Sequence, residues 1–125
     1  MNYLAHMLLS DGSPEGLVGN LAGDFVRGVD LSSLSEPMQA GVALHRAVDR
    51  FTDSHPTVQR SRSRLPESWR HYRGVLVDIF YDHFLARDFE THAGEALDVF
   101  AGRVYSALYD HHDNLPPRLQ HAAPV

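Results

Sequence analysis

The chain has 125 residues, of which 43% are apolar and 22% charged, and this length and composition are typical of one folded globular domain. It has no cysteine, so a disulfide scaffold, a thiolate zinc site and a cysteine nucleophile are excluded. The formal net charge of −5 disfavours binding to nucleic acid or an anionic membrane, and the lack of a long apolar run or a signal-peptide pattern predicts a cytoplasmic location.

Helix signals run through the chain, while no segment alternates apolar and polar residues as a half-buried strand would. We therefore predict an all-α fold, a compact bundle of about six helices. In chain order, the expected helices cover residues 2–10, 14–27, 36–52, 56–65, 66–87 and 93–109. Residues 1–114 are expected to form a single helical domain, and residues 115–125 a loop or disordered tail.

Several titratable side chains are predicted to face the interior of this bundle. In the expected helix 36–52, His45 and Asp49 lie four residues apart on the apolar face. Asp78 and Asp82 have the same spacing in a helix so apolar all round that we expect it to be central and buried. A buried carboxylate must be paired, protonated or bound to a metal ion, so both pairs need an explanation.

His6 and Asp24 raise the same question in the first two expected helices, because each is flanked by apolar residues. The candidate metal ligands are therefore His6, Asp24, His45, Asp49, Asp78 and Asp82. Histidines and carboxylates without a thiolate suit Mn²⁺, Mg²⁺, Fe²⁺ or Zn²⁺, and phosphoryl chemistry is one use of such a site. Structural alternatives stay open: a hydrogen-bonded core histidine at His6, a plain ion pair between His45 and Asp49, or pairing of Asp24 with Arg46.

The basic residues are distributed unevenly along the chain. All eleven are arginines, and five of them fall within 14 residues that contain a single acid, Glu67. This basic strip comprises Arg60, Arg62, Arg64, Arg70 and Arg73. On an acidic protein such a strip is either a solvated face or a docking surface for an acidic partner.

Four strings of the sequence resemble the acyl carrier protein phosphodiesterase family. They are MNYLAHMLL at 1–9, GNLAGDFVRG at 19–28, GVALHRAVDRFTDSHP at 41–56 and VDIFYDHFLAR at 77–87. The resemblance implies an HD-domain-like helical fold, since this family is similar to the HD-type metal-dependent phosphohydrolases. The adjacent His-Asp pair of that type is missing, because His45 and Asp49 are four residues apart.

The resemblance also implies an activity. Members hydrolyse the phosphodiester between 4′-phosphopantetheine and a serine of holo-acyl carrier protein, with a divalent cation that is typically Mn²⁺. The six candidate ligands fall within the family's strings. We further expect Asp24, His83 and Arg46 to take part in catalysis, with His83 as a candidate acid and Arg46 beside the phosphate. The acidic carrier protein would dock on the basic strip.

The sequence departs from the family at its end. Members usually continue with further helical sequence beyond the region that matches Leu115 and Pro116, whereas this sequence ends within ten residues. An inactive helical binding module is therefore an alternative to an active enzyme, and a homodimer is one way to cover exposed apolar surface. A further alternative is an HD-like hydrolase of another phosphoester, such as a nucleotide.

Overall fold

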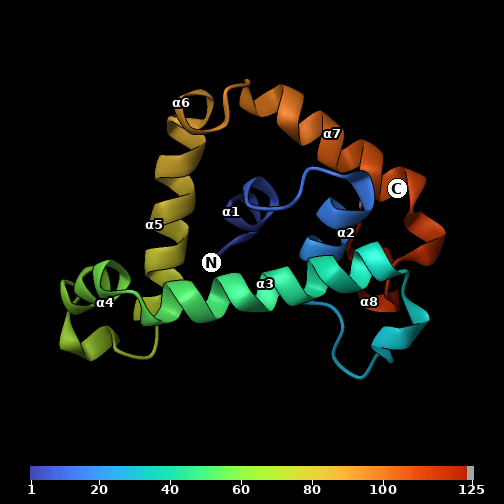
Figure 1. Cartoon of the computed structure of the whole chain (residues 1–125). Coiled ribbons are helices and arrows are strands. Elements are labelled where there is room, and N and C mark those ends of the chain that lie inside the picture. Colours follow the sequence, from blue (N-terminus) through green and yellow to red (C-terminus); the bar gives the residue numbers. More distant parts are fainter. Residues whose placement is uncertain (124–125) are drawn as a thin grey trace.

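The computed structural model describes residues 1–123, which fold into eight α-helices, and this confirms the all-α prediction. The helices are α1 Tyr3–Leu8, α2 Pro14–Ala22, α3 Glu36–Ser54, α4 Pro56–Ser63, α5 Arg73–Arg87, α6 Phe89–Ala93, α7 Leu97–Asp110 and α8 Pro117–Ala122. Short 3₁₀ turns lie at Leu31–Ser33, Glu67–Trp69 and His112–Asn114. Figure 1 shows α3, α5 and α7 as three sides around α1 and α2.

The starts of α2 and α3 follow from serine–proline signals in the sequence. The Ser13 hydroxyl accepts a hydrogen bond from the Gly16 N–H at 3.0 Å, and the Ser35 hydroxyl accepts one from the Met38 N–H at 3.4 Å. The proline in the first turn of each helix has a backbone angle that suits a helix and no N–H to leave unpaired. Both predicted starts are therefore confirmed.

The end of α2 differs from the prediction. The helix stops at Ala22 rather than near residue 27, and the chain turns at Gly23 with the Phe25 N–H donating to the Ala22 carbonyl at 2.7 Å. Val26 is nevertheless buried in the core. A buried residue in a turn continues the apolar spacing of the preceding helix, so the pattern overestimated the helix length. Asp24 consequently lies in the turn, not on the helix.

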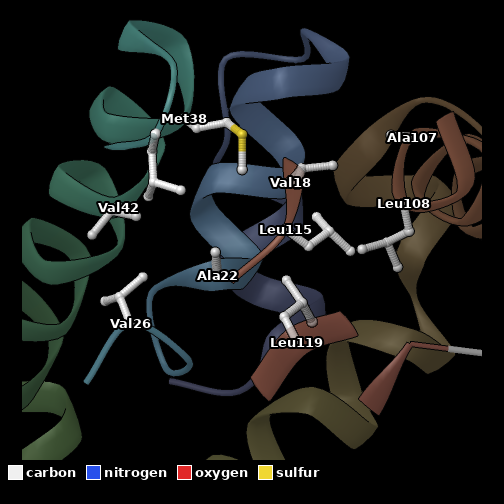
Figure 2. Close-up of a cluster of buried hydrophobic side chains, with 10 residues drawn as sticks. Val18, Ala22, Val26, Met38, Val42, Ala107, Leu108, Leu115 and Leu119 are labelled. Atoms are coloured by element: carbon white, nitrogen blue, oxygen red, sulfur yellow. The ribbon is translucent and has the colours of Figure 1, made fainter. Parts of the chain in front are cut away.

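The main core lies where α2, α3, α7 and α8 meet. Figure 2 shows its buried side chains, which include Val18, Ala22, Val26, Met38, Val42, Ala107, Leu108, Leu115 and Leu119. A second cluster joins α1, α2, α6 and α7 through Met7, Leu17, Phe89 and Phe100. Burying one large apolar side chain contributes about 1.5–3 kcal/mol, so these clusters hold the helices that carry the site.

The prediction of a loop or disordered tail over 115–125 is wrong for most of that range. Residues 117–122 form α8, and Leu115 and Leu119 are buried in the main core. The adjacent prolines Pro116 and Pro117 are typical of a loop, but Pro117 occupies the first turn of a helix, where proline is tolerated. Residues 124–125 of the predicted tail lie outside the described residues.

α2 and α3 cross at very short range, and glycines make this possible. A Cβ atom on Gly19 would lie 2.4 Å from the Met38 carbonyl oxygen, and one on Gly41 would lie 2.6 Å from the Asn20 nitrogen. Since no side chain fits at either position, the two backbones approach closely. This crossing brings the turn after α2 next to the middle of α3, where the candidate ligands lie.

The prediction that the helix before residue 87 is central and buried is wrong. Only Val77 of α5 is fully buried, whereas Val75 and Ile79 are more than half exposed. The apolar spacing shows which residues can be buried, but α5 packs on α1 along one side and leaves its other side open. Across residues 1–123, no helix has both the length and the apolar character that spanning a membrane requires.

Two further boundaries differ from the prediction. The segment expected as one helix over 66–87 is a 3₁₀ turn at Glu67–Trp69 followed by α5, which begins at Arg73. The segment expected as one helix over 93–109 is divided by Gly94, whose φ of 75° ends α6 before α7 begins at Leu97. Glycine adopts this left-handed conformation without the steric cost that other residues incur.

Candidate metal centre

Three of the six candidate ligands converge between α1 and α3. One ligand atom from each of His6, His45 and Asp49 lies within 4.8 Å of the ligand atoms of the other two. Within residues 1–123, this is the one group of three or more such side chains close enough together to hold a metal ion. Both histidines are buried, while the Asp49 side chain is 34% exposed. The helical spacing of His45 and Asp49 places them together, and α1 supplies His6 from the opposite side.

The imidazole nitrogens of this cluster face carboxylates. Asp49 Oδ1 lies 3.0 Å from His6 Nε2, and Asp49 Oδ2 lies 3.4 Å from His45 Nε2. Asp24, from the turn after α2, brings its Oδ1 to 3.1 Å from His45 Nε2. Asp24 pairs with His45 and not with Arg46, the partner that the sequence left open. Four candidate ligands from three segments therefore meet at one place.

The orientation of His45 is set by the backbone of α2. Its Nδ1 lies 2.8 Å from the Asn20 carbonyl oxygen, which can only accept, so Nδ1 carries a hydrogen and donates it. Nε2 then points at the carboxylates of Asp24 and Asp49. A lone pair on Nε2 would repel both, so a positive charge belongs there, supplied either by a proton on Nε2 or by a cation.

The second histidine limits the protonation of the first. The rings of His6 and His45 are stacked, with centroids 3.7 Å apart and planes 9° from parallel. Burial lowers the pKa of His6 below its usual value, and the neighbouring charge of His45 lowers it further, while Asp49 acts in the opposite direction. Two protonated rings at this distance would repel, so the stacked pair disfavours a proton charge on both rings at once, and the neutral imidazole is the form that binds metal ions.

The amino group of Met1 is a part of this site that the sequence did not indicate. Its ammonium lies 3.1 Å from Asp49 Oδ1 and 3.6 Å from Asp78 Oδ2. Burial acts to lower the pKa of this amine, but the two acids outweigh it and the net pKa is raised. Burial likewise acts to raise the pKa of Asp49, but the ammonium and the imidazoles keep it below its usual value. The ammonium thus connects Asp78 to Asp49.

Asp82 lies on the same helix as Asp78 but outside the cluster of ligand atoms. Its Oδ1 is buried and has no hydrogen-bond partner in the structure. Burial raises the pKa of Asp82, against the effect of the Leu4 and Ala5 backbone N–H groups. The carboxylate therefore faces the first turn of α1. The structure brings Asp78 close to the site through Met1 and leaves Asp82 at its edge.

The two other residues expected to act in catalysis are exposed. His83 lies on α5 with its ring edge-on to Phe84, at a centroid distance of 5.2 Å. Arg46 lies on the exposed side of α3, next to His45 in sequence. No hydrogen bond or ion pair in residues 1–123 links either of them to the His6–His45–Asp49 cluster. Their roles stay predictions.

The basic strip is partly used by the protein itself. Arg62 pairs with Asp53 at 2.9 Å, and Arg73 pairs with Glu67 at 3.2 Å while also donating to the Leu65 carbonyl. Arg60 donates to the Thr57 hydroxyl at 3.1 Å. Arg64 and Arg70 are exposed. The last two are thus the members of the strip whose charge is most open to a partner.

The cluster has the chemistry of a divalent-cation site. Two imidazole nitrogens and a carboxylate face one point, and the Asn20 carbonyl orients His45 as outer partners commonly orient metal-binding histidines. Gly23 completes this arrangement, because a Cβ there would lie 2.3 Å from His45 Cγ. The sequence did not indicate the roles of the Asn20 carbonyl and Gly23, although Gly23 itself and Gly19, directly before Asn20, are residues that permit close backbone contact.

Comparison with known proteins places these residues in a family. The sequence model described as acyl carrier protein phosphodiesterase matches residues 1–125. A protein of that name from Serratia proteamaculans is 36% identical over 121 residues, which are 96% of this chain and 63% of the relative. One from Pectobacterium atrosepticum is 41% identical over 87 residues, 70% of this chain and 45% of the relative. One from Yersinia pestis is 34% identical over 121 residues, again 96% and 63%.

The chain spans less than two thirds of the length of these curated relatives. No solved structure matches the chain.

Proposed function

Because the chain belongs to the acyl carrier protein phosphodiesterase family, we propose that it hydrolyses the phosphodiester between 4′-phosphopantetheine and a serine of holo-acyl carrier protein. Water adds to phosphorus, the bond from phosphorus to the serine oxygen breaks, and a proton passes to that oxygen. The products are the free serine of apo-carrier protein and 4′-phosphopantetheine. The names of the relatives support the substrate, and the cluster described above supports the chemistry.

The orientation of His45 is the single observation that carries this proposal. Its Nδ1 donates to the Asn20 carbonyl, and its Nε2 points at Asp24 and Asp49. This arrangement is best satisfied by a cation held by His6, His45 and Asp49, with Asp24 beside it. We propose Mn²⁺ as the metal, because two imidazoles and carboxylates without a thiolate suit it, and Mg²⁺, Fe²⁺ and Zn²⁺ have related preferences.

A bound divalent cation would polarise the phosphodiester oxygens and lower the pKa of a water molecule. The chain's own residues would do the rest. Asp24, at 49% exposure, is the most open of the carboxylates paired with the histidines, so we assign it the acceptance of the proton from the attacking water. Asp49 holds both histidines in place through its two oxygens. Asp78 bears on the cluster through Met1.

The exposed residues near the cluster are assigned to substrate contacts. Arg46 follows His45 on α3, and a guanidinium there can pair with phosphate oxygens in two hydrogen bonds. His83 stays the candidate acid for the leaving serine oxygen. The basic strip, and Arg64 and Arg70 in particular, is the surface that we assign to the acidic carrier protein. These roles require a bound substrate that brings Arg46, His83 and the basic strip together.

The direct test is incubation of holo-acyl carrier protein with the purified chain and Mn²⁺, followed by intact-mass measurement of the carrier. We expect loss of the phosphopantetheine mass, dependence on the metal, and loss of activity in Asp49→Asn. His92→Gln, an exposed histidine on α6, is the matched control and should keep full activity. A carrier of unchanged mass alongside turnover of nucleotide phosphoesters would instead support the alternative hydrolase. Without turnover of either substrate, the inactive binding module would be the better interpretation.

A further inference from the structure

The chain's single tryptophan lies on the surface, in the turn between α4 and α5 that contains the 3₁₀ segment Glu67–Trp69. Trp69 is 48% exposed, and Tyr72, three residues later in the same turn, is 66% exposed. We call residues 65–72 the aromatic turn, and Figure 1 shows it beside α4 at one corner of the molecule. Tryptophan and tyrosine are among the residues that most often dominate the binding energy of a protein interface. Their exposure therefore indicates an interaction surface.

Hydrogen bonds hold the aromatic turn in one conformation. The Arg73 guanidinium donates to the Leu65 carbonyl at 2.6 Å and to the Pro66 carbonyl at 3.3 Å, which ties the start of the turn to the first residue of α5. Within the turn, the Trp69 N–H donates to the Pro66 carbonyl at 3.0 Å, and the Tyr72 N–H donates to the Trp69 carbonyl at 2.7 Å. A loop that is already ordered loses less conformational entropy when a partner binds. The turn thus presents its aromatic side chains in a fixed arrangement.

The charges beside the aromatic turn indicate the class of partner. Arg70 directly follows Trp69, and Arg64 directly precedes the turn. Both arginine side chains are exposed, and within residues 1–123 neither takes part in an ion pair. The one acid of the turn, Glu67, is paired with Arg73. Two open guanidinium groups beside two exposed aromatic rings attract an acidic protein surface and repel a basic one.

The aromatic turn is connected to the metal centre through α3. Arg62, near the end of α4, pairs with Asp53 of α3 at 2.9 Å. Asp53 follows Asp49 by four residues, which is about 6 Å along a helix. The phosphodiester of holo-acyl carrier protein is attached to a serine of the carrier itself, so the carrier surface has to reach the metal centre. A docking surface anchored one helical turn from Asp49 satisfies this requirement.

We propose that Trp69 and Tyr72 are the apolar anchors by which the chain binds the carrier protein, while Arg64 and Arg70 steer its acidic surface onto them. This inference rests on the proposed function, because the carrier protein is the acidic partner which that function requires. It goes further by assigning the affinity to two aromatic residues rather than to charge alone. Charges at the rim of an interface act mainly on the association rate, whereas buried aromatic anchors act on the lifetime of the complex.

The first test uses Trp69 as the probe, since the chain has no other tryptophan. An apo-carrier protein without tryptophan is titrated into the chain. Apo-carrier has the docking surface but no phosphodiester, so binding is measured without hydrolysis. We expect the Trp69 emission to move to shorter wavelength, and its quenching by acrylamide to weaken, until both saturate. Unchanged emission would overturn the proposal, and so would a larger shift with single-stranded RNA than with the carrier.

The second test removes one anchor. Trp69→Ala should raise the dissociation constant of dye-labelled apo-carrier, measured by fluorescence anisotropy, at least ten-fold, and Trp69→Phe should keep most of the affinity. Tyr109→Ala on α7 is the matched control, because Tyr109 is 72% exposed and lies outside the aromatic turn. Equal affinities of Trp69→Ala and Tyr109→Ala would contradict the anchoring role. Circular dichroism shows whether each variant is folded, and if Trp69→Ala is not, the emission of the wild type decides.

The binding and hydrolysis measurements separate this inference from the proposed reaction. Binding of apo-carrier at Trp69 without hydrolysis of holo-carrier would support the docking surface and contradict the proposed reaction. Hydrolysis of holo-carrier by a chain whose Trp69 emission does not respond to the carrier would support the reaction and overturn the docking surface.

Discussion

His6 and His45 show how neighbouring residues determine the chemistry of the site. Their stacked rings, 3.7 Å apart, share the carboxylate of Asp49 and lie in a buried position. Burial opposes the charged form of the His6 ring, and the uncharged form is the one that a divalent cation needs. The same arrangement that lowers the pKa of His6 therefore prepares the site for a metal ion.

The pH dependence of stability follows from His6. The pKa of His6 in the folded, metal-free protein is lower than the usual histidine pKa that it has in the unfolded chain. At pH values between these two pKa values, the unfolded state therefore binds more protons than the folded state. The stability that His6 contributes is present above about pH 6.5, the usual histidine pKa, and is lost as the pH falls through the folded-state pKa. Urea unfolding of metal-free protein between pH 8 and pH 5 should show this decline, and His6→Gln should flatten it. An equally steep decline in His6→Gln would show that another group is responsible.

Metal affinity should depend on Asp49 more than on any exposed acid. Asp49 contacts both histidines, so Asp49→Asn removes a ligand charge and loosens both rings. We expect the Mn²⁺ dissociation constant measured by calorimetry to rise at least ten-fold, the effect that loss of a partner in a metal site typically has. Asp53→Asn, one turn further along α3, is the matched control and should change it little. Equal effects of the two substitutions would argue that Asp49 is not a ligand.

The residues of the site were predictable to different degrees. His45 and Asp49 follow from helical spacing, His6 and Asp24 from their place among apolar residues, and the family resemblance falls on the same four residues. Met1 and the Asn20 carbonyl could not be predicted, because side-chain periodicity carries no information on a terminal amine or on a backbone acceptor. Asp82 was expected among the ligands for its spacing from Asp78, but spacing does not reveal that the start of α1 packs against it.

At the scale of elements, the crossing of α2 and α3 is the contact that positions the site. Gly41→Ala would place a Cβ 2.6 Å from the Asn20 nitrogen and 2.8 Å from the Gly16 carbonyl oxygen, so the helices must separate. We expect a loss of about 1–3 kcal/mol of stability, as for other overpacked contacts. The measurement is urea unfolding, and weaker Mn²⁺ binding should accompany the loss because Asn20 orients His45.

Gly102→Ala provides the control for this change. Gly102 lies on α7 with no atom within 4 Å of the added Cβ, so alanine should be neutral or stabilising by up to about 1 kcal/mol through helix propensity. A Gly41→Ala protein as stable as Gly102→Ala would contradict the close crossing of α2 and α3.

The helices themselves were predicted better than their ends and their burial. Capped starts at Ser13 and Ser35 have clear local signals, and both were confirmed. The end of α2 was not, because Val26 continues the apolar pattern from a turn. The exposure of α5 was not predicted either. Burial depends on which neighbours pack against a helix, and a single sequence carries no direct information on those neighbours.

At the scale of the whole molecule, charge is separated between the basic strip and the rest of an acidic chain. If holo-acyl carrier protein is the substrate, as we propose, this asymmetry predicts that its association with the chain slows as salt is added, since screening weakens steering. Reversing the charge of Arg64 and Arg70 together to glutamate should lower the association rate constant at least ten-fold at low salt, as measured by stopped-flow mixing. Both side chains are exposed, so folding should be unaffected.

A matched reversal separates steering from net charge. Arg118 on α8 is also exposed and lies outside the basic strip, so Arg118→Glu should change the association rate constant much less. The same holds when a second exposed arginine outside the strip is reversed together with Arg118, which matches the charge change of the double reversal inside the strip. A rate without salt dependence, or equal slowing by reversals inside and outside the strip, would show that the carrier docks elsewhere.

The central claim is that His6, His45 and Asp49 hold one divalent cation between α1 and α3. The most direct measurement is anomalous diffraction from crystals of the protein grown with Mn²⁺, collected where manganese scatters anomalously. The account predicts one strong peak bordered by the Nε2 atoms of both histidines and an oxygen of Asp49, with Asp24 beside it. Manganese bound only at other positions, or no peak with both histidines still paired to their carboxylates, would contradict it.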